Sequence, residues 1–288
     1  MGYNKTRIKN KRKNVFFGIS DMLKLKYTIF SLFFIYIGML LAAIPTLMQF
    51  ILLNIAAVFA RASGMSANRY IGYDYDKKNP KKKMWSSIRL FKKNEILLLF
   101  VLFSFIFILS AFFLNLLAFI LSPLVILLFI IEPKIKKYTQ HRHLIMGLIN
   151  GLGIFGGYIA ITGTIPYFWS IFILWLGYGF MLGGSDIIYS MNYIEYDKKN
   201  KLKTYPVVYG KKHADLYSIY FHTISFLFFL MFGIIINSIF IIIAVLASGI
   251  VLTLWHIKIK TIPNISFSYY NGLISTILLI GMFLTVFK

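Results

Sequence analysis

Long apolar runs separated by short polar segments dominate the hydrophobic pattern of the chain. Crossing a bilayer takes about 20 mostly apolar residues in a helix. Continuous runs favour helices, because the strands of a membrane barrel alternate apolar and polar residues. The pattern therefore predicts an all-α polytopic membrane protein with about nine transmembrane helices. The runs lie approximately at Tyr27–Ala43, Thr46–Met65, Ile96–Leu114, Leu116–Ile131, Leu144–Thr162, Tyr167–Tyr189, Tyr217–Ile236, Ser238–Trp255 and Phe267–Phe287.

Charged residues gather in every second loop. The N-terminus and the loops after the second, fourth, sixth and eighth runs hold nearly all of them, and the other loops hold none. Because Lys and Arg mark cytoplasmic loops, we expect a cell-membrane protein with a cytoplasmic N-terminus and with Lys288 outside. We divide the chain into a basic cytoplasmic segment, 1–25, and a single transmembrane domain, 26–288. No signal peptide is expected, because the first apolar run is long enough to remain as a helix.

The composition agrees with a membrane chain and excludes some chemistry. Hydrophobic residues make up 59% and charged residues 14%, against about 45–50% and 25% in soluble domains. The net charge of +22 does not indicate nucleic-acid binding, because topology and lipid head groups explain basic loops between apolar runs. The chain has no Cys, which excludes disulfides, thiolate nucleophiles and Cys-ligated zinc.

The few acidic residues cluster at two places on the predicted cytoplasmic side. The sequence Asp-Lys-Lys-Asn occurs at 76–79 and again at 197–200, each time after an apolar run. These acids are either solvated loop charges paired with lysines, which contribute little to stability, or ligands of Mg²⁺ and a diphosphate. Basic residues that could bind phosphate lie in the same layer. They are Arg61, Arg69, Lys77, Lys78, Lys81, Lys82, Lys136 and Lys137.

Two long segments resemble the Asp-rich motifs of the UbiA family of intramembrane prenyltransferases. Residues 60–81, ARASGMSANRYIGYDYDKKNPK, are similar to the first motif, and residues 185–199, SDIIYSMNYIEYDKK, to the second. The first is most similar to the 4-hydroxybenzoate polyprenyltransferase branch. Further similarity at 28–30, 136–139 and 159–163 extends the resemblance over most of the chain.

The resemblance implies a helical bundle with a central cavity that opens to lipid. The motif-bearing cytoplasmic loops, 61–95 and 185–212, would face each other across it. They would bind Mg²⁺ and a polyprenyl diphosphate, whose prenyl group would pass to a small aromatic acceptor in quinone or prenyl-lipid biosynthesis. Neither a nucleic acid nor a particular protein partner is implied.

The resemblance also implies roles for individual residues. Asp76 and Asp197 would be catalytic. The metal would be held by Asn68, Asp76, Asn192 and Asp197. We add Asp74 and Glu195, two residues before the family acids, because irregular backbone at a helix end could turn them towards the metal. The diphosphate would be bound by Arg61, Asn68, Arg69, Lys81, Lys136, Lys137, Asn192 and Lys198.

The sequence departs from the family pattern at two equivalent positions. Gly72 and Tyr193 stand where the family normally has the first Asp of each motif. Three hypotheses therefore remain: an active prenyltransferase with an altered site, a catalytically degenerate relative that binds isoprenoid lipid or a partner, and an unrelated transporter. A transporter would bury ionisable groups at the bilayer midplane, whereas the apolar runs contain His222 but no acid near mid-run except Asp186, which lies towards the cytoplasmic end.

Overall fold

The protein is a bundle of long helices. A computed structural model describes residues 18, 20, 25–79, 86–258 and 266–288, and within these ranges it contains helices and turns but no strand. This confirms the all-α prediction. Lys81 and most of the basic segment 1–25 lie outside the described residues. The helices are α2 (Leu25–Ala42), α3 (Leu47–Lys78), α4 (Ser86–Leu90), α5 (Lys93–Leu114), α6 (Leu116–Ile135), α7 (Arg142–Thr162), α8 (Trp169–Ser190), the 3₁₀ turn η1 (Met191–Tyr193), α9 (Ile194–Lys199), α10 (Tyr205–Ile235), α11 (Ile239–Lys258) and α12 (Ser266–Val286).

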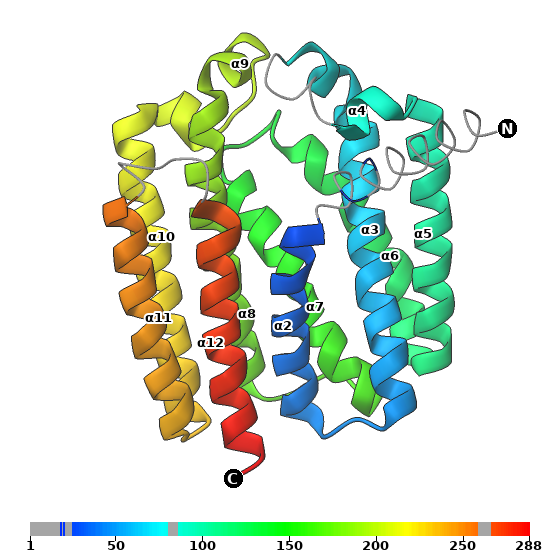
Figure 1. Ribbon diagram of the computed structural model, residues 1–288, viewed down its shortest axis with the longest axis vertical. Helices are drawn as coiled ribbons and strands as arrows, with labels where there is room; N and C mark the ends of the chain where they lie inside the picture. Colours follow the sequence, from blue (N-terminus) through cyan, green and yellow to red (C-terminus); the bar gives the residue numbers. More distant parts are fainter. Residues whose placement is uncertain (1–17, 19, 21–24, 80–85, 259–265) are drawn as a thin grey trace, which may run out of the picture.

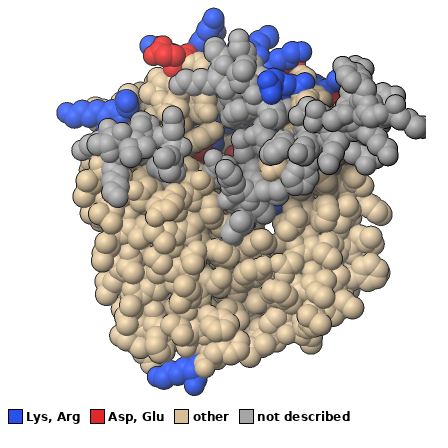
Figure 2. Space-filling model, viewed as in Figure 1, with Lys and Arg blue, Asp and Glu red and all other residues tan. Residues whose placement is uncertain are grey.

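Most of these helices can cross a membrane. In the described part of the chain, eight helical segments are long and apolar enough to do so, and the apolar part of α2, Phe30–Ala42, is a shorter ninth. The prediction of about nine spans is confirmed on this basis. Lys and Arg gather at the end of the molecule that carries α4 and α9, while the sides are almost free of charge (Figure 2).

The helices form two groups with α2 and α7 between them (Figure 1). On one side α3 packs against α5 and α6, and on the other α8 packs against α10, which contacts α11. The central α7 contacts α2, α6 and α8, and α12 closes the bundle between α11 and α2. The two motif regions, at the ends of α3 and α8, therefore belong to different groups and meet at one end of the bundle.

Small residues allow the central helices to approach closely. A Cβ atom added at Gly157 of α7 would lie 2.1 Å from the carbonyl oxygen of Ile35 in α2. One added at Gly147 would lie 2.1 Å from the carbonyl oxygen of Gly179 in α8. Backbone contacts of this kind are typical of membrane bundles, where packing rather than hydrophobic burial holds helices together. They fix α7 tightly against both neighbours.

Two helices differ from the predicted apolar runs. The second run was predicted to end at Met65, with the first motif in a loop, but α3 continues as a helix to Lys78 and the loop prediction is wrong there. A helix of 32 residues is about 48 Å long, so it exceeds the hydrocarbon core of about 30 Å. Likewise α10 begins at Tyr205, twelve residues before the predicted run, and is interrupted at Gly210, which has φ of 78°. Hydropathy marks the apolar part of a helix and misses its polar continuation.

Candidate functional site

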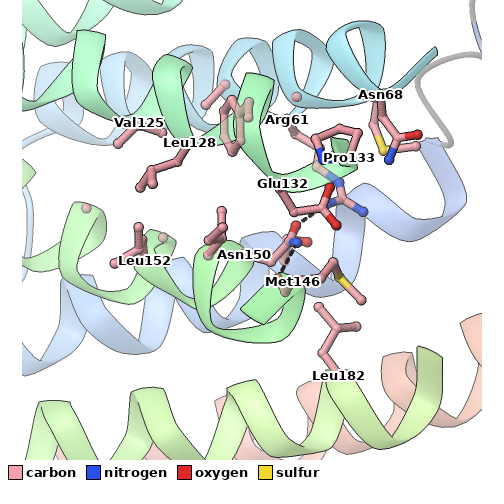
Figure 3. A pocket seen from close by; sticks show the side chains of 18 of the residues that line it. Arg61, Asn68, Val125, Leu128, Glu132, Pro133, Met146, Asn150, Leu152 and Leu182 are labelled. Carbon is pink, nitrogen blue, oxygen red and sulfur yellow. Dashed lines mark hydrogen bonds between the residues drawn. The ribbon is translucent and has the colours of Figure 1, made fainter. Parts of the chain in front are cut away.

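A cavity of about 500 Å³ lies at the centre of the bundle and contains the ends of both motifs. Its walls come from α2, α3, α5, α6, α7, α8, the segment after α8 and the start of α12. One part of the wall is apolar, with Val125, Leu128 and Leu152, and the next part is polar, with Arg61 and Glu132 (Figure 3). The cavity therefore has an apolar part next to a charged part, as a ligand with a long apolar tail and a charged head requires.

The first motif places a buried ion pair at the charged end. Arg69 donates to the Oδ2 atom of Asp76 at 3.1 Å, and both side chains are at most 6% exposed. Both residues line the cavity. Gly72 lies between them on the helix, and a Cβ atom there would be 3.6 Å from Oδ2 of Asp76. This position therefore provides space and no ligand, and Asp76 is the carboxylate that the first motif brings to the cavity.

The second motif reaches the cavity through a break in the helix. After Ser190 the chain makes one 3₁₀ turn and resumes as α9, which carries Asp197. Tyr193, the second departure from the family pattern, lines the cavity and shares a hydrogen bond of 3.1 Å with the hydroxyl group of Tyr189. Tyr196 donates its hydroxyl hydrogen to the carbonyl oxygen of Tyr75. This bond ties the two motifs together beside Asp76.

Basic side chains approach the same end from the residues that follow α6. The ammonium groups of Lys136 and Lys137 lie 5.8 Å and 5.1 Å from the centre of the Tyr75 ring, within cation–π range. Lys136 lines the cavity, and its carbonyl oxygen accepts a hydrogen bond of 2.8 Å from the backbone N–H of Lys203. Lys137 is exposed, and its interaction with the Tyr75 hydroxyl group raises the pKa of Lys137, which keeps it charged at neutral pH.

A second set of polar groups lies on α7 and α8. Arg142 donates to Oδ2 of Asp186 at 2.6 Å, and Nδ1 of the buried His143 donates to the same oxygen at 2.7 Å. Because Nε2 of His143 accepts from the backbone N–H of Tyr205 at 3.4 Å, the ring is the neutral Nδ1–H tautomer. Arg142 and Asp186 line the cavity. The network fixes the guanidinium group of Arg142 at the charged end.

Arg61 lies deeper than the motif carboxylates. Its guanidinium group donates to Oδ1 of Asn150, whose amide nitrogen donates to the carbonyl oxygen of Met146 at 2.7 Å (Figure 3). Along α3, Arg61 and Asp76 are separated by about 22 Å, at about 1.5 Å per residue. A diphosphate bound at Asp76 does not span this distance. This spacing is between backbones, and the predicted contact between Arg61 and the diphosphate stays a prediction.

The structure brings together about half of the residues that the sequence predicted. Those that line the cavity are Arg61, Asn68, Arg69, Asp76, Lys136 and Asp197. Those described but absent from its lining are Asp74, Lys137, Asn192, Glu195 and Lys198. Asp74 is exposed and pairs with Lys93 at 2.7 Å, Glu195 is exposed, and Asn192 donates to the carbonyl oxygen of Tyr189 at 3.1 Å. Their predicted metal contacts stay predictions, and the structure turns these side chains elsewhere.

Sequence reasoning missed several polar residues of the lining, including Asp186. Glu132 and Arg142 are at the ends of apolar runs, where they look like ordinary loop charges, and Asn150 is a lone amide within a run. Pro133 directly follows Glu132 inside α6, but a proline at this position does not by itself indicate a cavity wall.

The donor atoms of the lining suit a hard cation. Among the described residues, no group of three or more His, Cys, Asp or Glu side chains is placed to hold a metal by itself. Asp76, Asp197 and the amide of Asn68 nevertheless line one cavity. Mg²⁺ commonly takes one or two carboxylates and completes its shell with water and substrate phosphate. The residues therefore fit Mg²⁺ in the presence of a diphosphate.

Comparison with solved structures finds the same fold in prenyltransferase relatives. A UbiA homologue from Aeropyrum pernix K1 in the apo form is 26% identical with a TM-score of 0.81, over 89% of this chain and 97% of that one. A UbiA homologue from Archaeoglobus fulgidus bound to DMAPP and Mg²⁺ is 17% identical with a TM-score of 0.73, over 93% and 98%. A digeranylgeranylglyceryl phosphate synthase is 19% identical with a TM-score of 0.66, over 96% and 99%.

Sequence comparison assigns the family directly. Curated protein sequences gave no match. The model of the UbiA prenyltransferase family matches residues 31–284, which is nearly the whole transmembrane domain and includes both motifs. From this match, together with the fold, we conclude that the chain belongs to the UbiA prenyltransferase family.

Proposed function

We propose that the protein transfers a polyprenyl group from a polyprenyl diphosphate to an aromatic, 4-hydroxybenzoate-like acceptor in the membrane, with Mg²⁺ as cofactor. Such a reaction belongs to quinone or prenyl-lipid biosynthesis. The observation that carries the proposal is that Asp76 and Asp197, from two separate motifs, line one cavity with Lys136 and Arg142. The related homologue bound to DMAPP and Mg²⁺ supports the choice of donor and metal.

The charged end of the cavity would hold the diphosphate. Asp76, Asp197 and Asn68 would hold Mg²⁺, and Lys136 and Arg142 would donate to phosphate oxygens. When bound, Mg²⁺ neutralises charge that develops on the leaving diphosphate. Lys136 and Arg142 add positive charge from fixed positions, which is effective where water is excluded. Arg142 needs no rearrangement for this, because Asp186 already orients it.

The apolar part of the cavity would hold the prenyl chain. Its lining residues, such as Val125, Leu128 and Leu152, offer an oily wall that keeps water from an allylic cation. Arg61 lies between this wall and the motif carboxylates, beside Asn150 (Figure 3). At that depth it is placed to contact the acceptor rather than the diphosphate.

A second candidate function is isoprenoid binding without turnover. The observation in its favour is that Arg69 already occupies one oxygen of Asp76, while Gly72 and Tyr193 add no carboxylate. A chain of this kind would still bind a prenyl diphosphate through Lys136 and Arg142. Product formation separates the two candidates.

The test is a transfer assay with purified protein in detergent. Labelled geranyl diphosphate is incubated with 4-hydroxybenzoate and with other aromatic or glycerol-phosphate acceptors, in Mg²⁺ or in EDTA. We expect a prenylated product that requires Mg²⁺ and falls at least 100-fold in Asp197→Asn. The control variant Asp215→Asn removes a carboxylate outside the cavity and should keep wild-type activity. Donor binding without any product would favour the second candidate, and absence of any donor binding, with or without Mg²⁺, would refute both.

We also propose that the basic end of the bundle faces the cytoplasm. Lys and Arg gather at that end (Figure 2), as expected for cytoplasmic loops. Because the chain has no Cys, single cysteines placed at Lys199 and Thr164 report opposite ends. In intact cells a membrane-impermeant maleimide should label Thr164→Cys and spare Lys199→Cys. The reverse pattern would show the opposite orientation.

A further inference from the structure

Glu132 is a carboxylate in the cavity wall that the proposed mechanism does not use. It lies on α6 directly before Pro133, near Arg61 and Asn150 (Figure 3). Its side chain is partly exposed, and it lines the cavity. An ionisable group within a transmembrane segment is costly to keep and generally marks a function.

The carboxylate of Glu132 has no hydrogen-bond donor in the described part of the chain. It forms no ion pair there either, although Arg142, Lys136 and Arg61 are near enough to interact with it electrostatically. By contrast, Asp76 and Asp186 in the same lining each accept from an arginine. Since buried polar groups in folded proteins almost always have partners, an acceptor facing a ligand cavity calls for a donor on the ligand.

The neighbouring Arg61 carries a positive charge beside this carboxylate. One nitrogen of its guanidinium group is bonded to Asn150, and its Nε atom is buried without a partner among the described residues. A free acceptor therefore faces the cavity close to a positive guanidinium group, deeper than Asp76. A ligand that fits this part of the cavity carries a hydroxyl group for Glu132.

We propose that Glu132 binds the hydroxyl group of the prenyl acceptor and takes its proton during transfer. The inference rests on the proposed function and narrows it to acceptors that present a hydroxyl group at this depth. A compound of the same shape with a methyl ether in place of the hydroxyl group leaves Glu132 without a donor. It is therefore rejected, as sites built around a hydrogen bond reject analogues that lack it.

Every proton in the proposed transfer step has a stated donor and acceptor. The C1–O bond of the prenyl diphosphate breaks and its electron pair leaves with the diphosphate. Glu132 takes the phenolic proton while C1 bonds to the neighbouring ring carbon, which gives a dienone. The ring proton passes to the departing diphosphate, and Glu132 returns its proton to the oxygen. Phenol and carboxylate are both restored, and no oxidant or reductant is required.

Binding and turnover test the proposal separately. Dissociation constants are measured for 4-hydroxybenzoate and 4-methoxybenzoate in the presence of Mg²⁺ and the unreactive donor analogue geranyl thiolodiphosphate. Wild-type protein should bind the hydroxyl compound about 10-fold to 100-fold more tightly, as a hydrogen bond to a charged group predicts. Glu132→Leu should bind the two compounds equally. Glu132→Gln, which keeps an acceptor oxygen but no base, should lose about 100-fold or more in kcat with little change in KM.

The controls distinguish a failure of the Glu132 proposal from misfolding and from a failure of the proposed function. Each Glu132 variant must bind geranyl thiolodiphosphate with wild-type affinity, and Asp215→Asn must behave as wild type. A wild-type protein without preference for the hydroxyl compound, or a Glu132→Leu variant that keeps the preference, overturns the inference. Failure of the proposed function looks different: no acceptor is prenylated by the wild-type protein, whereas the binding comparison still gives its answer.

Discussion

The buried pair between Arg69 and Asp76 predicts a large and selective effect on stability. Asp76→Asn removes the charge and leaves the guanidinium group of Arg69 in a site where it is about 6% exposed. At 3.1 Å, the Coulomb attraction is about 5 kcal/mol for an effective dielectric constant of about 20. Removing one partner of a buried pair typically costs about 3–5 kcal/mol, because the other charge stays buried. We expect the melting temperature of Asp76→Asn to fall by about 10 °C.

A double variant that removes both charges is the comparison for Asp76→Asn. In Arg69→Met/Asp76→Asn both charges of the pair are absent, and an apolar side chain of similar length fills the space. Replacing a buried pair by apolar groups is often neutral, so we expect the melting temperature to return to within a few degrees of wild type. The double variant should nevertheless stay inactive in prenyl transfer, because the carboxylate of the first motif is missing.

Tryptophan fluorescence in detergent during heating is the assay, and labelled geranyl diphosphate reports activity. The reasoning is refuted if Asp76→Asn melts within 2 °C of wild type, or if the double variant is no more stable than the single one. Either result would mean that the pair is not desolvated as its burial indicates. A double variant that recovers both stability and activity would refute the catalytic role of Asp76.

Three further predictions concern backbone and helix contacts. Gly157→Ala should lower the melting temperature strongly, because its Cβ would meet a backbone carbonyl at 2.1 Å. The control Gly156→Ala, whose Cβ has nothing within 4 Å, should keep the wild-type melting temperature. Equal melting temperatures of the two variants would contradict the close approach. Gly210→Ala should cost about 1–3 kcal/mol of unfolding free energy although its Cβ has open space, and an unchanged chemical denaturation midpoint would contradict backbone strain as the cause. Tyr196→Phe removes the hydrogen bond to the carbonyl oxygen of Tyr75 and so releases α9 from α3. It should weaken Mg²⁺-dependent binding of geranyl diphosphate about 3-fold to 10-fold. Wild-type affinity in a titration would show that this hydrogen bond does not position the site.

Hydropathy predicted the transmembrane architecture well because its physical cause is local. A run such as Ile96–Leu114 has to be a helix in lipid, whatever surrounds it. The polar end of α3 was missed because Asn68 and Asp76 are unfavourable in lipid, and only the cavity makes a helical position suitable for them. The kink at Gly210 was missed because its backbone angles depend on where α10 has to cross.

The candidate site was predictable where the motifs carry it. Asp76 and Asp197 line the cavity, as the resemblance implied. Asp74 is two residues before Asp76, and on a regular helix this offset turns it to Lys93 on the outer face. Glu132 was not predictable, because a charge at the end of an apolar run normally lies in solvent. Only the packing of α6 against the neighbouring helices places it in a cavity wall.

The charges of the cavity lining nearly cancel, although the whole chain carries +22. Among the described residues of the lining there are four acids, Asp76, Glu132, Asp186 and Asp197, and four bases, Arg61, Arg69, Lys136 and Arg142. A neutral lining suits a low-dielectric interior, but it leaves no surplus positive charge for a free diphosphate. The diphosphate group of the donor would therefore bind together with its counter-ions. Donor and cation would then enter as one nearly neutral particle, and donor affinity should rise steeply with cation concentration.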